Sequence, residues 1–411
     1  MPNLLNRERI EQSMRKKGID VLIAGTKENV QYISDSLLPG YAVLPLKREI
    51  DPFVVTWVAF ADKVVESETW IKDRKYCGTF FFEKLVDDNL TELEKRMYKE
   101  ISPIQGKIEE WWKLQKGGAE GVPGFIDNLI EGIKERNLET ARIGIEENGV
   151  SISIYNMLKR KLPEAEFILA GEVLKHARMV KTPFEIELFR EGTPIVEKGI
   201  QDVCKIAKEG VTEQELLNNY KESVVAEGAG IDFNIIFAFG HRSVMPTSGM
   251  GMIRPSVKLK RGDMIRFNPS INYKNHPFHM GRTAVLGEPR DKKLEIYYQA
   301  LLKGEDAQLS ALRPGVKASE IYSICEKTIK ESGIPHYRRH HAGHALGVGP
   351  GYDTPIIAFN DDTPLEAGMV LNLEPNYFEF GLGGLQLEDT VLITESSYEL
   401  LSKSSRDIWK L

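Results

Sequence analysis

Cysteine is scarce in this sequence: Cys77, Cys204 and Cys325 are the only three among 411 residues. An odd number of widely spaced cysteines argues against a disulfide framework and against a zinc knuckle. Buried thiols behave as small hydrophobic side chains, and we expect that role for all three. The scarcity of cysteine indicates a reduced, cytoplasmic protein.

Long apolar runs and a strong charge excess are also missing. No stretch approaches the roughly 20 apolar residues that a membrane span requires. The first 18 residues alternate charged and apolar positions and lack the apolar core of a signal peptide. The formal net charge is only −6, with no long block of like charge. These absences argue against a nucleic acid or a membrane as partner.

What remains is an ordinary globular composition, with 42% hydrophobic and 28% charged residues, in a chain long enough for two or three domains. In the first half, apolar runs at 20–25, 41–46, 52–59 and 142–146 predict strands, and residues 5–17 and 28–32 predict helices. Strands that alternate with helices indicate an α/β layer structure. Residues 67–124, which include Trp111 and Trp112, follow no clear pattern.

A domain boundary is expected near residues 162–171, which gives domains at 1–168 and 169–411. Shortly after it, Thr182, Pro183 and Glu185 have the spacing of a capping box with proline in the first turn. We therefore predict a helix that begins at Pro183 and ends before Gly210.

The second half contains an internal repeat. Segments 259–269 and 365–375 carry Leu, Gly and Pro at matching positions. The pairs Gly210-Val211 and Gly315-Val316 each precede a predicted helix at almost the same offset. Such constant spacing predicts two pseudo-twofold halves. Polar side chains are expected to converge in a cleft between these halves.

The candidate chemistry centres on one histidine and two glutamates. His344 lies between Gly343 and Gly347, which let the backbone turn tightly and leave the imidazole projecting. Glu374 and Glu388 belong to apolar strand segments, where a carboxylate is costly unless it meets a cation or hydrogen-bond donors. These three side chains suit a metal site or acid–base chemistry.

Six of the eight histidines fall between residues 276 and 344. For His276, His336 and His341 we expect packing or surface roles. Because Glu388 and Asp389 are neighbours on a strand, only one of them faces the same side as Gln386. The alternative to a chemical site is that the buried carboxylates pair with Arg282 or Arg266.

The sequence resembles the superfamily of creatinase, prolidase and methionine aminopeptidase, with the pita-bread fold. The resemblance is carried by Lys-Thr-Pro-Phe-Glu-Ile-Glu at 181–187, Gly-His-Ala-Leu-Gly at 343–347, Leu-Glu-Pro at 373–375 and Leu-Glu-Asp-Thr at 387–390. Residues 18–32 resemble the N-terminal domain of the same proteins. The resemblance implies an N-terminal creatinase-type α/β domain and a C-terminal pita-bread domain with pseudo-twofold αββ halves.

In metallopeptidases of this superfamily, two Asp, one His and two Glu hold two metal ions. The resemblance places the histidine at His344 and the glutamates at Glu374 and Glu388. The first aspartate position falls on Asn268 and the second on His279. Positions that resemble further family histidines fall on Thr247, Tyr352 and His340, which the resemblance assigns with Asn268 to substrate binding.

These departures change the charge that the site offers. Two glutamates supply about −2, whereas four carboxylates would supply about −4, and two nearby divalent cations repel strongly without bridging carboxylates. We therefore expect at most one metal ion, Zn or Fe, held by His279, His344, Glu374 and Glu388. The other possibility is no metal, as in creatinase, whose first aspartate position is also Asn.

The resemblance implies a hydrolase that acts on a C–N bond of a small polar molecule, with His344, His279, Glu374 and Glu388 as catalytic residues. The alternatives are a lyase that eliminates across a C–S or C–N bond, a non-catalytic binding protein, and an Xaa-Pro dipeptidase or aminopeptidase. The resemblance also implies a homodimer.

Overall fold

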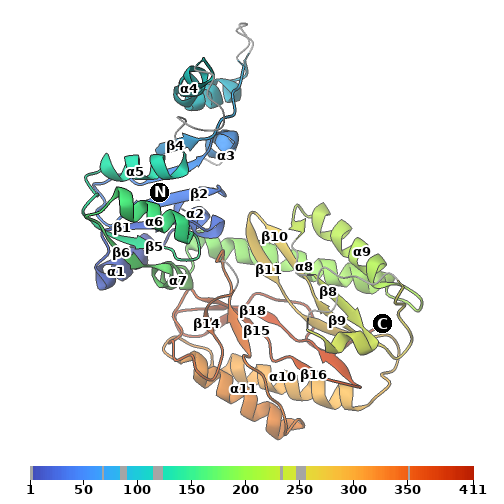
Figure 1. Cartoon of the computed structure of the whole chain (residues 1–411). Coiled ribbons are helices and arrows are strands. Elements are labelled where there is room, and N and C mark those ends of the chain that lie inside the picture. The colour runs from blue at the N-terminus through green and yellow to red at the C-terminus, as the bar shows by residue number, and fades with distance from the viewer. Residues whose placement is uncertain are drawn as a thin grey trace. The chain divides into compact units, whose positions relative to one another are not determined.

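The computed structural model describes residues 3–66, 69–83, 90–113, 124–231, 235–246, 256–349 and 352–411. The chain divides into two compact units, Met1–Arg178 and Met179–Leu411 (Figure 1). The predicted boundary after residue 168 lies one short helix earlier, before α7 (Gly171–Met179). No helix in the described ranges combines the length and hydropathy that a membrane crossing needs.

The first unit is built on a six-stranded mixed sheet in the order β4-β3-β2-β1-β5-β6. Its strands are β1 (Val21–Ala24), β2 (Gly40–Pro45), β3 (Phe53–Trp57), β4 (Asp73–Cys77), β5 (Arg142–Ile145) and β6 (Glu166–Leu169). Besides α7, its helices are α1 (Arg7–Lys17), α2 (Lys27–Ser34), α3 (Ala61–Glu66), α4 (Glu92–Lys113), α5 (Phe125–Lys134) and α6 (Ile152–Lys161), with a short 3-10 helix at Val58–Phe60. The predicted α/β layer structure is confirmed.

Two features of the first unit bear on the sequence predictions. Helix α1 ends at Gly18, whose φ of 65° is the left-handed conformation that glycine adopts without strain. Residues 67–124, which had no clear pattern, contain β4 and the 22-residue helix α4. The side chains of Trp111 and Trp112 lie outside the described residues.

The second unit has four helices in its described part: α8 (Pro183–Ile206), α9 (Glu213–Ala226), α10 (Lys293–Ala311) and α11 (Ala318–Ser332). Thr182 and Glu185 form the predicted capping box at the start of α8. The first-half strands are β7 (Gly230–Ile231), β8 (Ile236–Phe239), β9 (Met264–Asn268), β10 (Ser270–Tyr273), β11 (His276–His279) and β12 (Arg282–Val285), with a 3-10 helix at Gly240–Val244. The second-half strands are β13 (Gly343–Ala345), β14 (Asp353–Ile356), β15 (Val370–Leu373), β16 (Tyr377–Glu379), β17 (Gly383–Leu385), β18 (Asp389–Ile393) and β19 (Tyr398–Leu400). The last strand, β20 (Trp409–Lys410), pairs with β12 in the sheet of the first half.

The internal repeat is visible in the backbone. The N–H of Gly210 donates to the carbonyl of Leu259 at 2.8 Å, and the N–H of Gly315 donates to that of Leu365 at 2.8 Å. Both glycines have positive φ, 91° and 90°. Strands β8, β9 and β12 form consecutive antiparallel pairs, as do β13, β15 and β18. The two halves predicted from the spacing are therefore confirmed.

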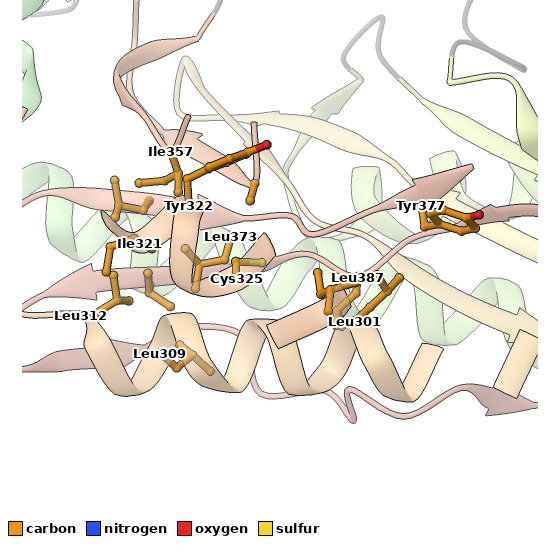
Figure 2. Packing of buried hydrophobic residues seen from close by; sticks show 14 of the residues in the cluster. Leu301, Leu309, Leu312, Ile321, Tyr322, Cys325, Ile357, Leu373, Tyr377 and Leu387 are labelled. Carbon is orange, nitrogen blue, oxygen red and sulfur yellow. The ribbon is translucent and has the colours of Figure 1, made fainter. Parts of the chain in front are cut away.

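Each half carries its own apolar core under a helix pair. In the first half, α8 and α9 contribute Phe189 and Tyr220, which pack with Phe237 and Phe267 of the sheet. In the second half, α10 and α11 lie side by side (Figure 1) and pack on β13, β15 and β18. Figure 2 shows Leu301 and Leu309 of α10, Ile321 and Cys325 of α11, and Leu373 of β15 in this cluster. The buried cores fix the strands whose ends carry the site described below.

Gly210→Ala and Gly315→Ala are each expected to lower the free energy of unfolding by about 1–2 kcal/mol, because a Cβ is strained at positive φ. Nothing lies within 4 Å of the Cβ that either substitution would add, so the loss reports backbone strain and not a clash. Gly210→Asn should lose less, since Asn enters the left-handed region more easily. Urea denaturation measures all three, and an Ala variant as stable as the wild type would contradict the expectation.

Candidate functional site

Glu388, directly before β18, is completely buried and accepts hydrogen bonds from four side-chain amides. Asn268 Nδ2 and Asn376 Nδ2 lie 3.2 and 3.0 Å from its Oε1, to which Gln386 Nε2 also donates. Asn372 Nδ2 lies 3.2 Å from its Oε2. The carboxylate is thus surrounded by neutral donors that come from both halves of the repeat, because Asn268 ends β9 and Asn372 belongs to β15.

Glu374 is the second buried carboxylate, and a histidine and an arginine lie next to it. His341 Nδ1 lies 2.8 Å from its Oε1, and Arg339 Nη2 lies 3.4 Å from the same oxygen. Asn376 also donates to Glu374 and so bridges the two glutamates. Burial favours the protonated form of Glu374, but the hydrogen bond from His341 and the charge of Arg339 hold its pKa well below the usual range. Burial and the charge of Glu374 raise the pKa of Glu388 well above its usual range.

His344, on β13, is 1% exposed, and two contacts fix the orientation of its ring. Its Nδ1 lies 3.0 Å from the carbonyl oxygen of Ala345, which assigns the proton to Nδ1. Its ring stacks on Tyr352 with 3.8 Å between ring centres. The other nitrogen, Nε2, is buried and has no hydrogen-bond partner among the described residues. Burial lowers the pKa of His344 to about 4, so the ring is neutral near pH 7.

His279, at the end of β11, lies next to His344 with 5.1 Å between ring centres. Asn372 Nδ2 donates to its Nε2 at 2.8 Å. The same amide donates to Glu388, so it connects His279 and Glu388, and Asn372 is the strand partner of His344 in the β13–β15 ladder. We refer to His279, His344, Glu374 and Glu388 with their amide donors as the histidine–glutamate cluster.

Asp389 faces the opposite side of the strand from Glu388 and forms a buried ion pair with Arg282, with 2.6 Å between Nη2 and Oδ1. Arg282 Nη1 also donates to the backbone carbonyl of Glu388 at 2.6 Å. Arg406 reaches the other Asp389 oxygen at 3.0 Å. The alternative that Arg282 neutralises a site glutamate is therefore wrong, because its carboxylate partner is Asp389. The predicted alternation of Gln386, Glu388 and Asp389 is confirmed.

Arg266, on β9, is 1% exposed. Its Nη2 donates to the backbone carbonyls of Met245 and Pro246, at 2.8 and 2.7 Å. Burial lowers the pKa of Arg266 to about 10, although the charge of Glu388 acts to raise it. The guanidinium is therefore still charged at neutral pH. Its guanidinium carbon lies 5.2 Å from the ring centre of Phe378, and that of Arg339 lies 5.5 Å from the same ring.

The structure brings together most of the side chains singled out from the sequence. His279, His344, Glu374, Glu388 and Asn268 are linked directly or through amides, and Tyr352 stacks on His344. His340 is exposed, with its ring 4.2 Å from that of His341. Thr247 lies outside the described residues. The expectation of a packing or surface role for His341 was wrong, because this side chain contacts Glu374.

The sequence reasoning missed most of the polar surroundings. Arg339, Asn372, Asn376 and Gln386 all contact a site glutamate. Strand alternation was the available signal for two of them, because Asn372 and Gln386 lie two residues before Glu374 and Glu388 and share their side of the strand.

The donor chemistry of the cluster does not fit a two-metal centre. Among the described residues, the cluster contains only two carboxylates. The oxygens of Glu388 already accept hydrogen bonds from amide N–H groups, and an N–H group cannot bind a cation. Two divalent ions would need bridging carboxylates to offset their repulsion. Across the described ranges, no three His, Cys, Asp or Glu side chains come together in an arrangement that could hold a metal ion.

Comparison with known proteins gives a family for each unit. Residues 187–395 match the model of metallopeptidase family M24, and residues 6–180 match the creatinase/prolidase N-terminal domain. An Xaa-Pro dipeptidase of Pyrococcus furiosus is 33% identical over 284 residues, which cover 69% of this chain and 78% of that protein. A putative dipeptidase of Bacillus subtilis is 28% identical over 365 residues, 84% of this chain and 99% of that protein.

Solved structures agree on the fold. The Xaa-Pro dipeptidase from Bacillus anthracis superposes with a TM-score of 0.78 at 22% identity, over 98% of this chain and 99% of that one. The prolidase from Pyrococcus furiosus superposes with a TM-score of 0.70 at 25% identity, over 96% of this chain and 100% of that one. The predicted pairing of a creatinase-type N-terminal domain with a pita-bread domain is confirmed.

Proposed function

This chain belongs to metallopeptidase family M24, and we propose that it is a hydrolase that cleaves a C–N bond of a small polar molecule at the histidine–glutamate cluster. The Xaa-Pro dipeptidases among its relatives support hydrolysis of a C–N bond. The proposal includes at most one divalent ion. It also includes a homodimer in the cytoplasm, which the family resemblance and the scarcity of cysteine favour.

The observation that carries the proposal is the buried Nε2 of His344. Because Nδ1 donates to Ala345, the lone pair of a neutral imidazole lies on Nε2, where no described residue uses it. A lone pair kept free in a buried polar cluster is suited to accept a proton from a bound water. The lowered pKa of His344 keeps this nitrogen unprotonated at neutral pH.

Glu388 is the second proton carrier in the proposed reaction. Its Oε1 accepts three amide hydrogen bonds and its Oε2 only one, so a proton taken up by Glu388 would be carried on Oε2. The raised pKa of Glu388 favours the protonated acid. In the proposed hydrolysis, water attacks the carbon of the scissile bond as its proton passes to His344 Nε2, and Glu388 Oε2 gives a proton to the leaving nitrogen.

Side chains around this pair are suited to orient the substrate. Tyr352 is 58% exposed and covers the ring of His344, and exposed His340 lies beside His341. Asn268 holds Glu388 from the opposite half of the repeat. We assign these three residues to substrate contact and positioning. Thr247 stays a further prediction for substrate binding.

The test is a screen of small zwitterions and Xaa-Pro dipeptides, with and without added Mn²⁺ or Zn²⁺, that detects each product by mass spectrometry. The proposal predicts release of a free amine with incorporation of oxygen from ¹⁸O-labelled water. An alkene product without labelled oxygen would indicate a lyase and overturn the proposal. Turnover of Xaa-Pro dipeptides only with added metal would instead indicate ordinary metallopeptidase chemistry.

A further inference from the structure

Arg266 is a buried cation for which the structure gives no carboxylate partner. Among the described residues, no Asp or Glu oxygen lies within 4.0 Å of its guanidinium, and its Nε is buried with no acceptor. Within the described part of the chain, its hydrogen bonds go to two backbone carbonyls alone. Removing a guanidinium from water costs several kcal/mol, which neutral carbonyls offset only in part. A buried guanidinium with this cost is better explained by a role in the histidine–glutamate cluster than by packing.

Arg339 supplies a second cation at the same place. It is 11% exposed and reaches Glu374, and both guanidinium groups lie against the ring of Phe378 on β16. Arg266 comes from the first half of the repeat, and Arg339 comes from the segment before β13 in the second half. The two halves therefore each contribute one guanidinium next to the two buried glutamates.

The cluster has positive charge beside it without any added ion. Glu374 and Glu388 contribute at most two negative charges, and only one while Glu388 carries its proton, and Arg266 and Arg339 contribute two positive charges. Two divalent ions would add four positive charges to this set. Like charges a few ångströms apart in a buried site repel strongly, so the added repulsion would far exceed what two glutamates offset.

We infer that Arg266 and Arg339 supply the positive charge that divalent ions provide in a two-metal centre, so that the cluster binds its substrate without a metal ion. This inference deepens the proposed function and rests on it only for the presence of a substrate. The resemblance places carboxylates at Asn268 and His279, where this chain has none, and Arg266 and Arg339 bring guanidinium groups to the same cluster.

Placing aspartates at positions 268 and 279, and then removing the guanidinium of Arg266, tests the inference. Mn²⁺ and Zn²⁺ are titrated calorimetrically into the wild type, the double variant Asn268→Asp/His279→Asp, and the same double variant with Arg266→Met. The matched control is the double variant with Lys303→Met, because Lys303 is an exposed cation on α10. Binding of the metal is read directly, so the result does not depend on any turnover.

The wild type should show no saturable heat, and the double variant should gain a metal site. Adding Arg266→Met should tighten that site by at least about tenfold, because the charge of Arg266 acts on buried Glu388. Adding Lys303→Met should change it less than about twofold, because Lys303 is exposed to solvent. Binding of either metal to the wild type at one or more equivalents would overturn the inference. Equal metal affinity of the double variant with and without Arg266→Met would also overturn it. If circular dichroism shows that the Arg266→Met protein is unfolded, Arg339→Met takes its place, with the same two outcomes.

Discussion

Replacing His344 by alanine is expected to lower kcat/KM by roughly 10²- to 10⁴-fold, the usual contribution of a positioned general base. The reason is that Nε2 of His344 is the buried nitrogen of the cluster that no described residue occupies. His279 is a poor replacement, because Asn372 already donates to its Nε2. Initial rates of amine release, measured on the substrate that the screen identifies, give the ratio.

His336→Ala is the matched control for this loss. His336 lies in the same unit, its side chain is 57% exposed, and it bonds Tyr377 and not a site glutamate. Its removal should leave kcat/KM within about twofold of the wild type, as is usual for surface substitutions. A His344→Ala protein that is folded and retains more than about a tenth of the wild-type rate would rule out His344 as the base.

Arg282→Met should have the largest effect on stability, a loss of about 3–5 kcal/mol, because it leaves the Asp389 carboxylate buried without one of its cations. Arg282 and Asp389 have no exposed surface, and the guanidinium also donates to the carbonyls of Gly281, Glu388, Ser404 and Ser405. Met keeps much of the volume and removes the charge. The quantity to measure is the free energy of unfolding from urea denaturation.

The matched control is the same substitution at Arg190, an exposed arginine of α8 that pairs with Glu187 and Glu399. Surface pairs of this kind contribute less than about 1 kcal/mol, so Arg190→Met should be nearly neutral. Arg282→Met/Asp389→Asn should lose less than the sum of the two single variants, because removing both charges leaves no unpaired ion. Equal losses for Arg282→Met and Arg190→Met would contradict the buried ion-pair account.

Backbone features were the part of this molecule that sequence could predict best. The offset between Gly210 and Gly315 predicted two equivalent halves, because a glycine at positive φ before a helix has a fixed geometric role. The capping box at Thr182 predicted the start of α8 for the same reason, since the side chain acts on its own backbone.

The site was predictable only in part. Strand alternation separates Glu388 from Asp389, and the resemblance to known families brings His279, Asn268 and His344 together. The partners of Glu374 could not be predicted, because Arg339 and His341 precede β13 and meet Glu374 only through the pairing of β13 with β15, which no local pattern encodes. That no described carboxylate lies within 4.0 Å of Arg266 likewise depends on the three-dimensional arrangement and not on a local pattern.

The central claim is that the charges of the histidine–glutamate cluster leave no place for a two-metal centre. The most direct measurement is the metal content per chain of freshly purified protein, by elemental mass spectrometry, with Asn268→Asp/His279→Asp purified in parallel. The account predicts a content well below one equivalent in the wild type and a higher content in the double variant. Two equivalents of a divalent metal in the wild type would contradict it.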